Sequence, residues 1–169
     1  MIAGTPRPDE LVERRRPLKI LFLSAAYLPH VGGIEILLQQ LCRGLRERGH
    51  AVEIVTADPR GPADVDGVRV HRLDVEGPLR ARDVRGLHGL QRRVGEIRDA
   101  FGPDLVHSHD VGALLWLYER ASRTSGVPLV VTVHNVMTRH LGEATGAFTP
   151  MAKMLEAADL VTAVSHHTL

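Results

Sequence analysis

The chain has 169 residues, and its 21 Lys and Arg almost balance its 20 Asp and Glu, so a net charge of +1 argues against an obligate nucleic-acid or polyanion binder. The length fits one domain, and because a domain of about 150 residues buries roughly 70% of its unfolded surface, a stapled mini-protein is excluded. Hydrophobic residues make up 44% of the chain, which is typical of a folded protein, and the single Cys42 favours a reducing, cytoplasmic setting.

The first part of the chain predicts a leader followed by a strand, a helix and a strand. Residues 1–17 hold three prolines and no sustained apolar period, so we expect a flexible leader before one domain over residues 18–169. Residues 18–24 form a nearly continuous apolar run, which is typical of a strand buried on both faces. Apolar residues then recur at helical spacing over 34–45, and a second strand is predicted at 51–56.

The same alternation continues to the end of the chain. We predict strands at 68–73, 105–108, 129–133 and 160–164, helices at 84–101, 111–125 and 148–157, and a long loop at 135–146. Strands that alternate with helices in this way predict an α/β fold, with a Rossmann-like, doubly wound and mostly parallel sheet of six or seven strands and helices on both faces.

Ligands of such folds bind at the carboxyl ends of the strands, so the residues that follow each strand are the candidates for chemistry. Gly32 and Gly33 open the helix after the first strand. Adjacent glycines allow close backbone approach, and the free N–H groups of a helix start favour a phosphate. The alternative is a tight turn without a ligand.

Histidines follow two other predicted strands. His109 and Asp110 come after the strand at 105–108, and His134 comes after the strand at 129–133. His107 and His109 share one face of their strand, so with Asp110 they suggest a metal site, although no other residue has clear ligand spacing. A histidine such as His134 at the end of an apolar strand is also compatible with simple packing.

Five segments in this order resemble the N-terminal domain of family 4 glycosyltransferases, over about residues 18–167. The segments are Pro29–Glu35, Leu45–Val52, Asp104–His109, Val133–Asn135 and Ala158–Ser165. The resemblance implies one half of a GT-B fold, in which two Rossmann-like domains face each other. It also implies transfer of a sugar from a nucleotide-diphosphate sugar to a sugar, lipid or small-molecule acceptor, with retention of configuration and no required metal or other cofactor.

In that family the N-terminal domain shapes the acceptor side, and the C-terminal domain holds the donor. No counterpart of the donor-binding half follows in this sequence, so we expect the chain alone to be inactive and to pair with such a domain in cis or in trans. The resemblance also implies roles for seven residues. These are Gly32 and Gly33 at the donor pyrophosphate, His134 at the reaction centre, His109 and Asn135 on the acceptor side, and Arg139 and Lys153 at an acceptor phosphate.

Three other interpretations stay open. A dinucleotide-dependent oxidoreductase would use Asp58 after the second strand to bind ribose, although the first loop lacks the G-x-G-x-x-G pattern. A non-catalytic module would bind an acceptor or pair with a donor domain. Six arginines flank the helix at 84–101 and predict either a solvated face or peripheral contact with an anionic membrane at the cytoplasmic side. They are Arg80, Arg82, Arg85, Arg92, Arg93 and Arg98.

Overall fold

The computed structural model describes residues 16–122, 125–134 and 149–165. Within these ranges, seven strands form one sheet in the order β3-β4-β2-β1-β5-β6-β7. The elements are β1 (Lys19–Ser24), α2 (Gly33–Glu47), β2 (Ala51–Thr56), β3 (Asp64–Val65), β4 (Val68–Arg72), α3 (Glu76–Arg80), α4 (Val84–Phe101), β5 (Leu105–Ser108), α5 (Ala113–Ser122), β6 (Leu129–Val133), α7 (Thr149–Glu156) and β7 (Leu160–Ala163).

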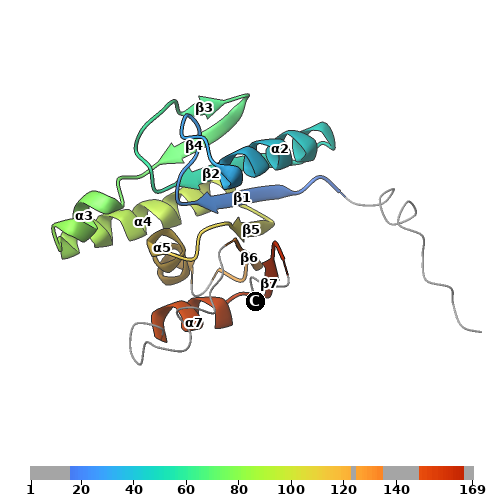
Figure 1. Ribbon diagram of the computed structural model, residues 1–169. Coiled ribbons are helices and arrows are strands. Elements are labelled where there is room, and N and C mark those ends of the chain that lie inside the picture. The colour runs from blue at the N-terminus through green and yellow to red at the C-terminus, as the bar shows by residue number, and fades with distance from the viewer. Residues whose placement is uncertain (1–15, 123–124, 135–148, 166–169) are drawn as a thin grey trace, which may run out of the picture.

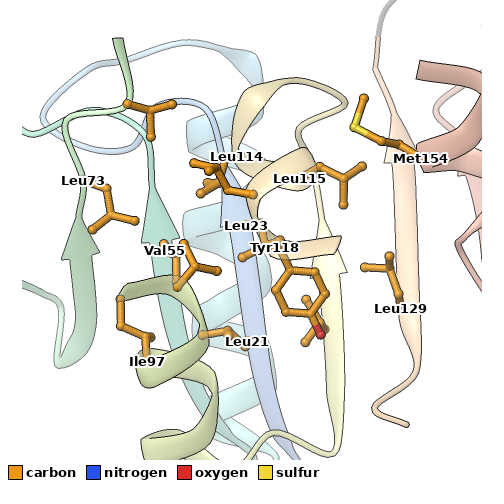
Figure 2. Close-up of a cluster of buried hydrophobic side chains, with 14 of the residues drawn as sticks. Leu21, Leu23, Val55, Leu73, Ile97, Leu114, Leu115, Tyr118, Leu129 and Met154 are labelled. Atoms are coloured by element: carbon orange, nitrogen blue, oxygen red, sulfur yellow. The ribbon is translucent and has the colours of Figure 1, made fainter. Parts of the chain in front are cut away.

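Helices cover the two faces of the sheet unequally. Figure 1 shows α2 on one side of the sheet and α4, α5 and α7 on the other. On the α2 side, Phe22 of β1 packs with Leu38 and Cys42. On the other side, Leu21 and Leu23 pack against α4 and α5, and Figure 2 shows this cluster of buried hydrophobic side chains. The continuous apolar run of β1 is explained by these two buried faces.

The strand pairing sets the position of the site. All neighbouring strands are parallel except β3 and β4. The chain runs from β1 to β2 on one side and returns through α4 to β5 on the other side, so the strand order switches between β1 and β5. The carboxyl ends of these strands share one edge, which is where ligands of doubly wound sheets bind.

The predicted fold class is confirmed, including the mostly parallel sheet, with differences in three elements. The helix predicted at 111–125 spans Ala113–Ser122. It begins at Ala113 because its first backbone hydrogen bond runs from the Trp116 N–H to the Gly112 carbonyl, and residues 123–124 lie outside the described ranges. The sequence reading missed β3 and α3. The predicted loop at 135–146 and almost all of the predicted leader lie outside the described residues.

The strand β3 is part of a hairpin with a two-residue turn. Asp66 and Gly67 connect it to β4, with φ angles of 52° and 75°. Two successive positive φ angles are those of a type I′ turn, for which Asp-Gly is a preferred pair. The short antiparallel β3 therefore lies at the edge of the sheet because this turn folds it back on β4.

Candidate functional site

The loop after β1 brings an unobstructed helix start to the carboxyl edge of the sheet. Gly32 is the extended N-cap residue of α2, and no side chain caps this end of the helix. A Cβ atom placed on Gly33 would meet nothing within 4 Å. The backbone at Gly33 is therefore open to a ligand, and the N–H groups of the first turn favour an anionic one.

The adjacent Gly32 has a different reason to lack a side chain. A Cβ atom on Gly32 would lie 2.5 Å from Oε2 of Glu35. The Glu35 side chain is 10% exposed, and its Oε1 lies 3.3 Å from Nδ1 of His30. Glu35 thus occupies the space beside Gly32, and the contact with His30 ties the loop to the helix. The sequence placed Glu35 in the first helical turn but gave no signal of its burial.

Three histidines from β5 and β6 form a row on the α2 side of the sheet. The ring centroids of His107 and His109 lie 4.3 Å apart, and those of His109 and His134 lie 5.0 Å apart. Phe22 of β1 contacts His107 and His109 at centroid distances of 5.4 and 5.7 Å. The structure therefore brings together His109 and His134, two of the residues predicted for the site.

Hydrogen bonds connect this histidine row across the strands. His109 Nδ1 lies 2.8 Å from His134 Nε2, and His107 Nε2 lies 2.7 Å from Oγ1 of Thr132. The Thr132 hydroxyl in turn lies 2.7 Å from Oγ1 of Thr162 on β7. The sequence reading missed both threonines, because each looks like an ordinary strand residue until the strands are paired.

Burial keeps the row neutral at physiological pH. Desolvation, with smaller contributions from the neighbouring histidines, lowers the pKa of His107 to about 4 and that of His109 to about 3. Desolvation also lowers the pKa of the half-buried His134. Neutral imidazoles each offer one donor and one acceptor, so the row can orient hydrogen bonds without adding charge to the site.

A pocket of about 620 Å³ lies at the ends of β1, β2, β4 and β5. At His30 it reaches residues 25–33, which connect β1 to the start of α2 and are named the glycine loop, and its wall includes the start of α5. Its charged lining is mainly acidic, with one arginine, and consists of Asp58, Arg60, Asp74, Glu76 and Asp110. Carboxylates accept hydrogen bonds from hydroxyl groups and repel anions, so this pocket suits a hydroxyl-rich ligand more than a phosphate.

Two alternative roles find little support in the geometry. The Asp58 carboxylate, proposed above for ribose, accepts hydrogen bonds from Nε of Arg60 at 2.8 Å and from Nη2 at 3.2 Å. The Asp110 carboxylate faces the backbone N–H groups of α5, so it does not complete a metal site with His107 and His109. Over the described ranges, no cluster of three or more potential metal ligands occurs.

The remaining predicted residues are spread over the chain. Lys153 is exposed on α7, which packs against α5 on the face opposite the histidine row. Asn135 and Arg139 lie outside the described residues.

Among the six arginines that flank α4, Arg98 points inward and donates hydrogen bonds to the Ala121 carbonyl at 2.8 Å and to Ser122 Oγ at 2.6 Å. In the part of the chain that is described, every helix is too short or too polar to cross a bilayer.

Comparison with known proteins identifies the family of this domain. The model of Glycosyltransferase Family 4 matches residues 31–169, which include Gly32, Gly33 and all three histidines of the row. The chain belongs to glycosyltransferase family 4. A search of curated proteins finds no match to the sequence.

Solved glycosyltransferase structures share the fold of this family 4 domain. MurG of Acinetobacter baumannii is 14% identical with a TM-score of 0.62, and the match covers 90% of this chain and 43% of that chain. UGT89C1 of Arabidopsis thaliana, complexed with UDP, is 12% identical with a TM-score of 0.56 and coverages of 89% and 43%. An α-glucosyltransferase in complex with UDP and a 13-mer DNA is 14% identical with a TM-score of 0.55 and coverages of 88% and 38%.

These likenesses concern the fold, and they confirm the expected Rossmann-like half of a GT-B architecture. The chain spans about two fifths of the length of these solved structures.

Proposed function

We propose that this family 4 domain forms the acceptor side of a retaining glycosyltransferase. The whole enzyme would transfer a sugar from a nucleotide-diphosphate sugar to a sugar, lipid or small-molecule acceptor, without a required metal. The observation that carries the proposal is the meeting, at one edge of the sheet, of an open helix start at Gly33 and a neutral histidine pair. The proposed setting is the cytoplasm, with peripheral membrane contact as a further possibility for the arginine-flanked helix.

Each end of the site would have a separate task. The N–H groups at Gly32 and Gly33 would stabilise the pyrophosphate as negative charge develops on the leaving group. His134 would hydrogen bond near the transferring sugar, with the buried His109 directly behind it. No nucleophilic side chain is required, because positioning and charge stabilisation supply most of the acceleration in such a transfer.

The acceptor would enter the acidic pocket beside the glycine loop. The carboxylates of Asp74 and Glu76 line this pocket and can accept hydrogen bonds from acceptor hydroxyl groups. Asn135, Arg139 and Lys153 stay predictions for the acceptor side, the last two for an acceptor that carries a phosphate.

Binding of nucleotide sugars to the isolated chain tests the donor side. In an NMR titration with UDP-glucose and GDP-mannose, we expect at least one of them to shift the backbone amide signals of Gly33 and its helical neighbours. Gly33→Ala fills the open space and should weaken that binding about tenfold, which corresponds to 1.4 kcal/mol. Gly89→Ala is the matched control, because a Cβ atom there also meets nothing within 4 Å, but in α4.

Three outcomes would contradict parts of the proposal. Binding of NAD without binding of either nucleotide sugar would favour the oxidoreductase interpretation. Equal weakening by Gly33→Ala and Gly89→Ala would remove the glycine loop from the donor site. Turnover of a nucleotide sugar by the chain alone would show that it is not inactive by itself.

A further inference from the structure

The contact between His109 and His134 raises the question of which ring donates the proton. His109 Nδ1 and His134 Nε2 lie 2.8 Å apart, so one nitrogen carries the hydrogen and the other presents a lone pair. His109 is 6% exposed, and desolvation holds its pKa near 3. Both rings are therefore neutral near pH 7, and each has a single N–H group. Two arrangements are possible, and they give His134 opposite tautomers.

The second nitrogen of His109 decides between these arrangements. His109 Nε2 is buried, and no described residue forms a hydrogen bond with it. If the proton were on Nε2, a buried N–H group would be left without an acceptor, which is rare in folded proteins. If the proton is on Nδ1, only a lone pair of the imidazole is left unpaired, and the N–H group is satisfied by His134.

We propose that His109 is a positioning residue, which donates its Nδ1 proton to His134 Nε2 and thereby holds His134 in the tautomer protonated on Nδ1. In that tautomer His134 presents an N–H donor through Nδ1. Its Nε2 lone pair is already occupied by His109, so His134 has no free nitrogen to act as a general base. The use of this donor on a sugar or acceptor oxygen rests on the proposed function, whereas the tautomer itself does not.

The surroundings of His109 hold the ring in place for this role. The His107 ring packs against it at a centroid distance of 4.3 Å, and Phe22 packs at 5.7 Å. His107 Nε2 is engaged by Thr132, at 2.7 Å, and is not available as a partner for His109. The acceptor-side role that the family resemblance implied for His109 stays a prediction, and under this proposal the buried ring would serve it through His134.

The tautomers can be read from long-range ¹H–¹⁵N NMR spectra of the chain labelled with ¹⁵N-histidine at neutral pH. Two other histidines serve as internal references. His50 Nδ1 accepts the Leu18 N–H at 3.0 Å, and His71 Nε2 lies 2.6 Å from the Glu53 carboxylate, so both rings carry a proton on Nε2. We expect His134 to show the opposite pattern, with the proton on Nδ1. A His134 protonated on Nε2 would overturn the proposal.

Two substitutions at position 109 test whether His109 sets the tautomer of His134. His109→Asn keeps an N–H donor close to the place of Nδ1, so His134 should keep its tautomer. His109→Asp offers only an acceptor, so His134 should move its proton to Nε2. An unchanged His134 pattern in the Asp variant would show that His109 does not set the tautomer. His30→Asn, at a histidine whose side chain is 55% exposed, is the control and should leave the signals of His134 unchanged.

The outcome stays interpretable if a variant fails or if the proposed function fails. The wild-type spectrum by itself decides the tautomer when a position-109 variant does not fold. Absence of nucleotide-sugar binding would count against the donor-side role proposed for Gly32 and Gly33 and leave the tautomer result standing. Conversely, if the chain binds a nucleotide sugar and His134 is protonated on Nε2, the proposed function is retained and the positioning role of His109 is rejected.

Discussion

Strands β5 and β6 have apolar side chains on one face and polar side chains on the other. Toward α5, Val106 and Val131 are completely buried in an aliphatic cluster. Toward the α2 side, His107 and Thr132 alternate with them along the same strands and form hydrogen bonds across the sheet. The aliphatic face holds the fold together, whereas the polar face is only partly covered and holds the candidate site. Neighbouring residues in one strand thus serve stability and function separately.

Removing a side chain from the aliphatic face should have the largest effect. Leu114 on α5 is fully buried in the cluster of Figure 2, so Leu114→Ala should lower the free energy of unfolding by about 2–5 kcal/mol. Urea unfolding measures this loss. Leu105→Ala is the comparison, since Leu105 is half-buried on the other face, and it should cost less than about 2 kcal/mol. Equal losses would mean that both faces are packed alike.

Placing a threonine on the apolar face of β6, or a valine on its polar face, should lower the free energy of unfolding by less than Leu114→Ala does. Val131→Thr places a hydroxyl group among aliphatic side chains and should cost about 1–3 kcal/mol of unfolding free energy. Thr132→Val removes a hydroxyl from the partly exposed face and should cost about 1 kcal/mol or less. Both are measured by urea unfolding. A larger loss for Thr132→Val would show that the threonine bonds, rather than the aliphatic cluster, hold β6.

The free energy of unfolding should depend on pH through the buried histidines of the polar face. Burial lowers the pKa of His107 to about 4, whereas an unfolded histidine titrates near 6.5, so the unfolded state binds more protons between these values. Stability should therefore fall as the pH drops from about 6.5 to 4. His107→Gln removes one such group and should reduce the slope by about 1.4 kcal/mol per pH unit. An unchanged slope would show that folding does not lower the pKa of His107.

Sequence periodicity was sufficient for the fold because each main element buries a regular set of side chains. Over residues 18–24 both faces of the strand are covered, and over 84–101 one stripe meets the sheet. The strand β3 was missed because two residues carry no periodicity, although Asp66–Gly67 is a turn signal that could have revealed it. The five-residue α3 is too short for a helical pattern to show.

The site was predicted less completely because contacts between strands depend on register. In the structure, His107 pairs with Val130, so Thr132, two residues further along β6, lies diagonally across from His107. The same offset of 25 positions joins His107 to Thr132 and His109 to His134. The sequence placed His109 and His134 at neighbouring strand ends, but it contains no signal for this register. The close approach of Glu35 to Gly32 likewise depends on side-chain direction.

The hairpin made by β3 also affects how the molecule meets other chains. A parallel sheet that ended at β4 would offer a row of free backbone groups to any extended peptide, and such edges promote aggregation. The two residues of β3 use part of this row, and the tight Asp66–Gly67 turn keeps the added strand close to its partner. This side of the sheet therefore has a short, protected border, which limits the addition of strands from neighbouring molecules.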